Sequence, residues 1–331
     1  MFSHLAGISV LVTGGSGFIG SHLVNSLQAA GARVTNLDIR APQLREHQQF
    51  WRSCDLLDQP AVAGEVAKAL PSVAFNLAAR TDISSGHAAL KVNTVGLATL
   101  AAELQRLDHP THLIHASTQL VMRPGHVAQH ELDFAPYSAY GESKADSEKL
   151  LHDLGNHPSW TIVRPTNVWG PRHPTFANQI WKYIAHGVYM HPTGYDPRRS
   201  YGYVANVVHQ LLRITELPTA QAAGKTFYVG DEPIPSSQWL DAFSTKLRGK
   251  PVRRVPVKVL WFAASAGEIS SRLGGPCPID RGRLYRMTTD YAVPMDQTIR
   301  VIGLGPVALE DGVDATVKWL RTSTGHTKAH V

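Results

Sequence analysis

The sequence predicts an α/β protein with a doubly wound parallel sheet and a smaller, mixed C-terminal region. Residues 8–20 begin as a short apolar run of strand type and end in a glycine-punctuated turn that leads into a helical pattern. Short apolar segments then alternate with amphipathic helical segments, which favours a parallel sheet covered on both faces. From Val168 onward, Pro, Gly, His and aromatic residues become frequent, and this composition is typical of loops and short helices.

The composition is that of a globular protein. The chain has 331 residues, of which 43% are hydrophobic and 18% are charged, so it can bury a full core and is not disordered. The formal net charge is +6, and a basic surface of this kind favours an anionic small molecule such as a nucleotide. Lys and Arg are spread out, without a basic stripe interleaved with aromatics, so no nucleic-acid partner is expected.

The expected location is the cytoplasm. Cys54 and Cys277 form neither a C-x-x-C pair nor a disulfide framework, which fits a reducing compartment. The first strand follows the N-terminus closely, so no signal peptide is expected. The longest apolar run, residues 257–266, is too short for a bilayer, which needs about 20 residues. It predicts a buried or interfacial helix, and no membrane partner is expected.

The opening glycines suit a dinucleotide-binding loop. Gly14 permits a tight turn, Gly17 lets the backbone approach a pyrophosphate, and Gly20 lets the helix pack closely on the strand. The N–H groups at the helix start would then face the phosphates. A lone motif of this kind is weak evidence, because glycine turns before helices are common.

The remaining elements follow in alternation. Strands are expected at 32–38, shortly before Cys54, and at 73–79, 112–118, 160–164 and 226–229, the last rejoining the main sheet. Helices are expected at 60–70, 87–107, 139–154, 236–248 and 307–321.

Asp38 ends the second strand, 18 residues beyond Gly20. A carboxylate there can accept both hydroxyl groups of an adenosine ribose and would repel a 2′-phosphate, which favours NAD over NADP. Arg40 lies nearby and can accommodate such a phosphate, so the choice stays open.

Tyr140 and Lys144 are four residues apart on a predicted helix and therefore share a face. We expect the lysine ammonium to lower the pKa of the phenol, which makes Tyr140 a candidate base. Ser117 and Thr118 follow the fifth strand, where a hydroxyl can bond the substrate oxygen that Tyr140 deprotonates. Either residue can be that hydroxyl, and the offset to Val121 favours Thr118.

No metal site is expected. His112 and His115 lie three apart on a strand, so their side chains point to opposite faces and cannot converge on one ion.

Taken together, the chain resembles the extended short-chain dehydrogenase/reductases, the NAD-dependent nucleotide-sugar epimerase/dehydratase group. The matching segments run in the family's order over nearly the whole chain: Thr13–Gly20 (T-G-x-x-G-x-x-G), Asp38, Asp55-Leu56, 76–79, Asn93, Ser117-Thr118, Tyr140–Lys144, 164–171, 199–204, and the closing segments 309–313 and 317–320.

The resemblance implies a Rossmann-type NAD-binding domain over residues 1–167, with 200–230 returning to it. It implies a substrate-binding region over 168–199 and 231–325, and a frayed tail at 326–331. The cofactor-binding residues it implies are Gly14, Gly17, Phe18, Ile19, Gly20, Asp38, Asp55, Leu56, Leu77, Ala78, Ala79, Asn93, Tyr140, Lys144, Pro165 and Val168.

The resemblance also implies a mechanism. Tyr140 takes a proton from a sugar hydroxyl, at C4, while hydride moves to NAD; Thr118 bridges the same oxygen and Lys144 holds the nicotinamide ribose. The substrate is a nucleotide-diphosphate sugar, and the residues implied to contact it are Ser117, Asn167, Asn178, Arg199 as the diphosphate clamp, and Tyr203.

Two departures narrow the activity. Dehydratases of this group carry an Asp-Glu pair after the strand-tip Thr, and sugar-acid decarboxylases carry a Glu there. Gln119 and Leu120 occupy these positions, so neither activity is expected. The family's usual Val-Tyr-Gly is Val121-Met122-Arg123, which removes a common substrate-contacting tyrosine and leaves the sugar unidentified.

Three activities remain open: a 4-epimerase, a one-way reductase of 4-keto sugars or of steroid- or flavonoid-like ketones, and a protein that senses NAD without catalysis. Residues 203–208 and the apolar run at 257–266 loosely resemble the ketone-reductase branch. A homodimer is expected through the helices at 87–107 and 139–154, because both segments look more apolar than one sheet face requires.

Overall fold

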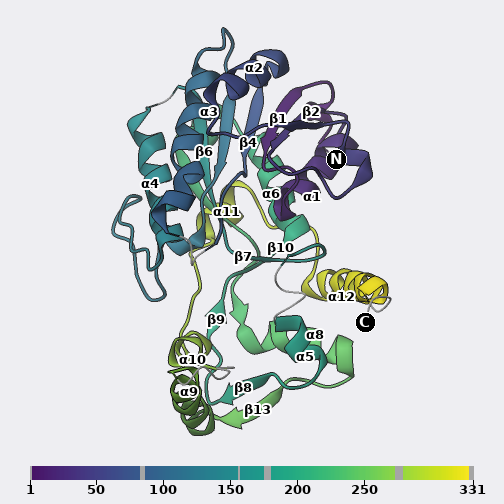
Figure 1. The fold of residues 1–331 in the computed structure, drawn as a ribbon, viewed down its shortest axis with the longest axis vertical. Helices are drawn as coiled ribbons and strands as arrows, with labels where there is room; N and C mark the ends of the chain where they lie inside the picture. Colours follow the sequence, from purple (N-terminus) through teal and green to yellow (C-terminus); the bar gives the residue numbers. More distant parts are fainter. Residues whose placement is uncertain (1, 83–85, 156, 175–179, 273–278, 328–331) are drawn as a thin grey trace. The chain divides into compact units, whose positions relative to one another are not determined.

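The computed structural model describes residues 2–82, 86–155, 157–174, 180–272 and 279–327. The chain forms two compact units, and each consists of several segments (Figure 1). Unit 1 contains residues 1–168, 204–230 and 294–306, and unit 2 contains residues 169–203, 231–293 and 307–331.

Unit 1 is built on a seven-stranded, wholly parallel sheet, with the strand order β11-β6-β5-β4-β1-β2-β3. This confirms the predicted fold class. The strands are β1 (Ser9–Thr13), β2 (Arg33–Asp38), β3 (Trp51–Ser53), β4 (Val73–Asn76), β5 (His112–Ala116), β6 (Ser159–Pro165) and β11 (Lys225–Val229). As expected, β11 rejoins the main sheet and pairs with β6.

Helices cover both faces of the sheet (Figure 1). They are α1 (Phe18–Ala29), α2 (Gln59–Ala69), α3 (Val95–Gln105), α4 (Ala139–Asp153), α6 (Val204–Ile214), α7 (Thr219–Ala222) and α11 (Asp296–Val301). Apolar residues of α2, α3 and α4 pack on one row of the sheet that includes Leu11, Ala74 and Leu113. On the other face α1 packs against α6.

Short 3₁₀ turns join these elements. They are η1 (Ser3–Leu5), η2 (Arg45–His47), η3 (His87–Asn93) and η4 (Gln119–Val121). The single helix expected at 87–107 is therefore wrong: η3 ends at Asn93 and α3 begins at Val95. Asn93 explains the interruption, because its side chain bonds the backbone N–H and C=O of Arg80 at 2.9 and 3.1 Å instead of serving a continuous helix.

The outer face of α4 also differs from the expectation. It is charged, since its exposed residues are Glu142, Asp146, Lys149 and Asp153. Of its buried apolar residues, Leu151 packs on the sheet and Ala145 packs on Val121 and Met122. The expected apolar outer face of α4 is therefore wrong, whereas the homodimer itself stays a prediction.

Unit 2 is small and mixed. Its helices are α5 (Ile180–Ala185), α8 (Ser236–Arg248), α9 (Val257–Arg272), α10 (Arg281–Thr288) and α12 (Leu309–Thr327). Its short strands are β8 (Met190–Thr193), β9 (Arg198–Arg199), β10 (Tyr201–Tyr203), β12 (Ile234–Pro235) and β13 (Arg253–Pro256), and β7 (Asn167–Trp169) lies at the boundary of the two units. Among them, β13 pairs with β8 in parallel and β12 pairs with β9 antiparallel.

Aromatic side chains form the core of unit 2. Trp239 stacks on Tyr201 with ring centroids 4.9 Å apart, and it packs against Phe243 at 4.6 Å. Trp169 joins them, and the helix α12 approaches closely because Gly312 faces this ring: a Cβ there would lie 2.8 Å from Trp169.

The unit boundaries differ from the expected ones in two places. Residues 294–306 belong to unit 1, where Thr298 donates to the carbonyl of Tyr228 at 2.5 Å. Residues 200–203 belong to unit 2, where the carboxylate of Asp231 accepts from the backbone of Tyr203 at 2.7 Å.

A buried ion pair links α4 to the sheet. Glu148, which is fully buried, accepts from Arg164 of β6 through Nε at 3.0 Å and Nη2 at 2.7 Å. The hydroxyl of Ser117, just past β5, donates to the same carboxylate. One side chain of α4 thus bridges two neighbouring strands.

We expect Arg164→Met to destabilise the protein by about 3–5 kcal/mol, because it leaves the buried Glu148 carboxylate without its countercharge, with only the Ser117 hydroxyl as a partner. Asp146→Asn is the matched control on the same helix. It removes an exposed pair with Lys149 and should cost less than about 0.5 kcal/mol. Urea unfolding at neutral pH measures both effects, and equal losses would contradict this account of α4.

Candidate active site

The glycine loop between β1 and α1 is tight because two other backbone segments crowd it. Gly14 has a left-handed φ of 73°, and a Cβ there would lie 2.6 Å from the backbone nitrogen of Ala78. A Cβ on Gly20 would overlap the carbonyl oxygen of Gly14, so the helix cannot approach the strand with any other residue. Both glycines are therefore required by the backbone packing itself.

Two side chains of β2 form hydrogen bonds to this loop. Asn36 accepts from the backbone N–H of Gly15 at 2.9 Å and donates to the hydroxyl of Ser16 at 3.2 Å. Asp38 accepts from the N–H of Ser16 at 3.1 Å and from the N–H of Arg40 at 2.9 Å. Sequence reasoning missed Asn36, although its position two residues before Asp38 places both side chains on the same side of the strand.

The loop suits a dinucleotide pyrophosphate. Within the described residues no side chain caps the start of α1 at Gly17, so the positive end of this helix is left for an anion. Phe18 and Ile19 open the helix, and Asp38 stands at the end of the adjacent strand, where an adenosine ribose would be bound. The residues present therefore fit the group.

The other predicted cofactor residues are distributed around the sheet edge. Leu77 donates its N–H to the carbonyl oxygen of Thr13, and Ala78 donates its N–H to the Thr13 hydroxyl at 3.3 Å. Leu56 is buried, whereas Asp55 is exposed. The structure places the remaining ones as follows: Ala79 in the loop after β4, Asn93 at the end of η3, Pro165 at the end of β6, and Val168 in β7.

The structure brings Thr118 and Tyr140 together. The two side chains share a hydrogen bond, and Thr118 also accepts from the N–H of Leu120 at 3.2 Å. Ser117, the alternative hydroxyl, points elsewhere and donates to the buried Glu148. The geometry therefore offers the Thr118 hydroxyl, rather than that of Ser117, to an oxygen bound at Tyr140.

The expected effect of Lys144 on Tyr140 is wrong for the protein alone. Burial raises the pKa of Tyr140 to about 12, and the hydrogen bond from Thr118 offsets this only in part. Burial also lowers the pKa of Lys144 to about 7, although the negative charge of Glu148 acts to raise it. The lysine Nζ lies 3.5 Å from Nε2 of His115.

A row of hydrogen-bonded polar side chains connects the sheet to the backbone of Lys144. The register aligns Thr13, Asn76 and His115 at the ends of three adjacent strands. Thr13 donates to Asn76 Oδ1 at 2.6 Å, Asn76 Nδ2 meets His115 Nδ1 at 3.0 Å, and His115 Nε2 meets the hydroxyl of Ser147 at 3.0 Å. Ser147 donates in turn to the carbonyl of Lys144 at 2.7 Å.

These hydrogen-bond partners determine which ring nitrogen of His115 carries the proton. Because Asn76 Nδ2 is a donor, the imidazole Nδ1 accepts and Nε2 carries the proton. Complete burial and the nearby Lys144 charge hold the pKa of His115 well below its usual value, so the ring is neutral. Sequence reasoning treated His115 only as a rejected metal ligand, and the signal that identifies its role is the strand register. Among the described residues no cluster of metal-ligating type is found.

In unit 2, Arg199 lies close to other cations. It is half-buried on β9, and among the described residues its guanidinium has no hydrogen-bond or ion-pair partner. Burial raises the pKa of Tyr189 to about 12, and the charges of Arg199, Arg254 and Arg283 oppose this rise, although Arg254 is paired with Asp241 at 2.8 Å. Such a cluster favours an anion.

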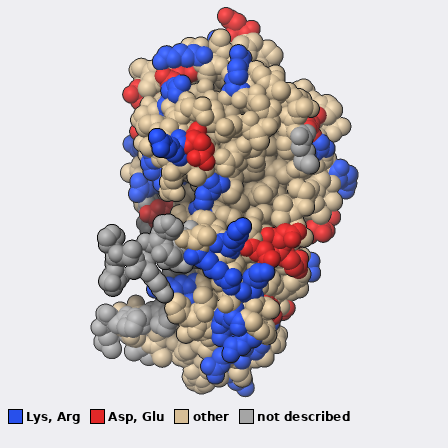
Figure 2. Space-filling view, turned by 90° about the vertical axis from the view of Figure 1, so that its right-hand side faces the viewer, with Lys and Arg blue, Asp and Glu red and all other residues tan. Residues whose placement is uncertain are grey.

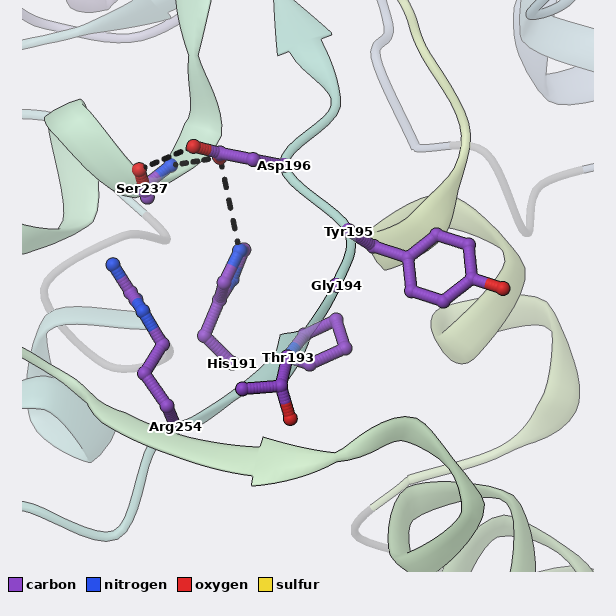
Figure 3. Close-up of a pocket in the computed structure, with 8 residues that line it drawn as sticks. His191, Thr193, Gly194, Tyr195, Asp196, Ser237 and Arg254 are labelled. Carbon is purple, nitrogen blue, oxygen red and sulfur yellow. Dashed lines mark hydrogen bonds and ion pairs between the residues drawn. The ribbon is translucent and has the colours of Figure 1, made fainter.

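A cavity of about 280 Å³ lies in the same unit (Figure 3). Its lining is polar and comes from β8, the turn after it, α8 and β13: His191, Thr193, Tyr195, Asp196, Ser237 and Arg254. Asp196 is held in place by Ser237, which donates its hydroxyl at 2.6 Å and its backbone N–H at 2.9 Å. Burial lowers the pKa of His191, so this ring is neutral beside Asp196.

The other predicted substrate residues are placed as follows. Asn167 is half-buried at the start of β7. Tyr203 is buried and packs on Trp169 at 4.9 Å, so its ring belongs to the aromatic core of unit 2. Asn178 lies outside the described residues.

The chain matches the family model described as NAD dependent epimerase/dehydratase family over residues 10–230. It is 26% identical over 320 residues to the 4-hydroxy-2-methyl-3-oxo-4-farnesyl-3,4-dihydroquinoline-1-oxide ketoreductase of Stigmatella aurantiaca, covering 92% of this chain and 94% of the relative. It is also 26% identical over 320 residues to the N-acetyl-alpha-D-glucosaminyl-diphospho-ditrans,octacis-undecaprenol 4-epimerase of Escherichia coli O157:H7, covering 94% and 95%.

Among solved structures, the UDP-glucose 4-epimerase of Thermus thermophilus in complex with NAD superimposes with a TM-score of 0.68. The two chains are 24% identical, and the match covers 94% of this chain and 98% of the other. This likeness supports the fold.

Lys144→Met should change stability in a pH-dependent way. In the folded protein Lys144 releases its proton near pH 7, but in the unfolded chain only near the usual lysine value of 10.5. The unfolded chain therefore binds more protons between these values, and the wild type gains stability as the pH rises through this window. We expect the variant's stability relative to the wild type to be highest at and below pH 7 and to decline toward pH 10.

Urea unfolding at pH 6.5 and 9.5 measures this effect, with the exposed Lys149→Met as the matched control. A Lys144→Met difference that stays constant between the two pH values would disprove a buried lysine of lowered pKa.

His115→Phe should destabilise the protein by about 1–3 kcal/mol, because it leaves Asn76 Nδ2 buried without its partner and removes one of the two partners of the Ser147 hydroxyl. If the side chains form one network, Ser147→Ala should cost less in the His115→Phe background than in the wild type, with a coupling of about 0.5–2 kcal/mol. Urea unfolding of the two single variants and the double variant measures this coupling. Strict additivity would show that the row is a set of independent contacts.

Proposed function

Because the chain belongs to the NAD-dependent epimerase/dehydratase family and NAD is therefore its cofactor, we propose that it is a nucleotide-sugar 4-epimerase. We base the choice of substrate on Arg199. This residue is half-buried, and its guanidinium has no partner among the described residues. A guanidinium bonds phosphate in a two-pronged way, and the neighbouring Arg254 and Arg283 add positive charge. A diphosphate-linked sugar supplies the matching anion.

The proposed chemistry uses the hydroxyl pair of unit 1. Tyr140 accepts the proton of the sugar 4-hydroxyl, and Thr118 holds the same oxygen by a hydrogen bond. NAD, held by the glycine loop and Asp38, would supply reversible hydride transfer at C4 of the sugar. Tyr140 then gives the proton back to the oxygen, so the reaction needs no net oxidant.

In the protein alone Tyr140 is protonated, so it can act as a base only when its pKa is lowered. With its pKa near 12, the phenol is neutral at physiological pH. Positive charge brought next to it lowers that pKa, and Lys144 is the cation on the same face of α4. The proposed role of Lys144 therefore requires its ammonium form, which is half-populated near pH 7.

The polar cavity is the proposed site for the nucleotide. It offers donors and acceptors from Arg254, Ser237, Asp196 and the neutral His191, which suits a base and a ribose. The proposed setting is the cytoplasm, where a buried free thiol such as that of Cys54 stays reduced.

A second candidate is an NAD(P)H-dependent ketone reductase. The similarity to the Stigmatella aurantiaca ketoreductase, which extends over 92% of this chain, favours it. The same Thr118 and Tyr140 would then donate a proton to a ketone oxygen, and the cofactor would leave after each turnover.

The test is turnover of purified protein with UDP-, GDP- and dTDP-sugars, followed by NMR of the C4 configuration. We expect one sugar class to epimerise. Tyr140→Phe should lower kcat by about 10²–10⁴-fold, because it removes the proton acceptor. Arg199→Gln should raise KM about 10–100-fold and leave kcat nearly unchanged, because it removes a charge-assisted phosphate contact.

Two outcomes would contradict the epimerase. The first is the absence of any C4 epimer from all sugars together with oxidation of NADPH by an apolar ketone, which supports the second candidate. The second is an unchanged KM in Arg199→Gln, which would remove the diphosphate argument.

A further inference from the structure

The helix α9 presents apolar side chains outward. Leu260 and Ala264 are buried against Val255 and Leu284, which fixes the inner face of this helix. The opposite side is open: Val259, Trp261 and Phe262 are 52%, 49% and 68% exposed. The expected buried or interfacial helix is therefore buried on one side only.

The neighbouring helix α10 extends this surface. The guanidinium of Arg281 lies over the Trp261 ring, 5.8 Å from its centroid, so the two helices meet at this residue pair. Tyr285 follows Arg281 by one helical turn and is 56% exposed. We name the surface formed by Lys258, Val259, Trp261, Phe262, Arg281 and Tyr285 the α9–α10 patch.

The segment of the sequence that carries this patch is basic. Residues 251–288 contain seven Lys and Arg residues but only two acidic residues, whereas the whole chain has a net charge of +6. Figure 2 shows Lys and Arg gathered in the lower part of its view, which faces the right-hand side of Figure 1, whereas α9 and α10 lie on the left of Figure 1. Exposed Trp and Phe beside a cluster of cations match the composition of helices that lie in a membrane interface.

We propose that the α9–α10 patch docks the protein on an anionic lipid surface. Trp261 and Phe262 enter the headgroup region, and Lys258 and Arg281 remain at its level, with their charges on the lipid phosphates. This is adsorption to one leaflet and not insertion across it: none of the helices the structure describes has the length and apolar character of a membrane span. The proposal amends the expectation that the protein has no membrane partner, and it does not depend on the sugar or ketone substrate.

Charge complementarity favours lipid over a second copy of the chain. A self-complementary contact between two such patches would bring Lys258 and Arg281 of both copies together, where like charges repel. An apolar surface rimmed by one sign of charge instead fits a partner with dense charge of the opposite sign.

The experiment is sedimentation of the full chain with phosphatidylcholine vesicles that contain either no or about 30% phosphatidylglycerol, in about 0.1 M salt. We expect at least roughly tenfold stronger partitioning to the anionic vesicles, and most of this preference should disappear in about 0.5 M salt. Equal partitioning to both vesicle types, or none to either, would overturn the proposal.

Variants separate the two parts of the patch. Trp261→Ser with Phe262→Ser should lower partitioning at least roughly tenfold, and Lys258→Gln with Arg281→Gln should lower it about 25-fold, from roughly fivefold for each cation. The control is Val127→Ser with Leu304→Ser, which removes exposed apolar side chains from unit 1 and should leave partitioning unchanged. Thermal unfolding shows that each variant is folded.

Analytical ultracentrifugation without lipid completes the test. A wild-type monomer that binds anionic vesicles through the patch supports the proposal. A dimer that Trp261→Ser with Phe262→Ser converts to a monomer, together with vesicle binding unchanged by that variant, would show that the patch joins two copies and would refute docking on lipid.

Discussion

The placement of α4 depends on charged and polar groups that have no access to water. Glu148 is fully buried, and removal of a carboxylate from water is costly unless its partners are complete. Arg164 and Ser117 supply those partners from β6 and from the end of β5. Since Tyr140 and Lys144 lie on the same helix, the position of both side chains over the sheet edge follows from this one carboxylate.

The second constraint comes from the strand ends. Thr13, Asn76 and His115 stand in register, and each has its hydrogen-bonding groups satisfied by the next. The neutral imidazole at the end of this row gives Lys144 a polar neighbour without a countercharge. Burial then lowers the pKa of the lysine toward neutrality, and only Glu148 opposes this. The lysine is thus held where a modest change in its surroundings alters its charge.

Much of unit 1 could be predicted because its signals are local. The spacing of Gly14, Gly17 and Gly20, the apolar runs and the Tyr140–Lys144 interval each depend on a few neighbouring residues. The predictions were wrong where contacts with residues distant in the sequence determine the local structure. Asn93 interrupts a helical pattern because it bonds Arg80, Asn36 supports a loop some 20 residues away in sequence, and the burial of Tyr140 outweighs the expected effect of Lys144. None of these contacts can be read from spacing alone.

The same distinction explains why the sequence leaves the substrate open. The residues proposed for hydride transfer, Thr118, Tyr140 and Lys144, lie after a strand end and on one helix, where the topology places them. Arg199, Arg254 and Arg283 come from β9, β13 and α10 and converge on Tyr189 only through the packing of unit 2. In the sequence, Arg254 and Arg283 look like ordinary surface cations, and only the resemblance to the family singles out Arg199. In the proposed function, the positive charge of Arg199 is what favours an anionic, diphosphate-linked substrate over a neutral ketone, since both substrates would use the same Thr118 and Tyr140.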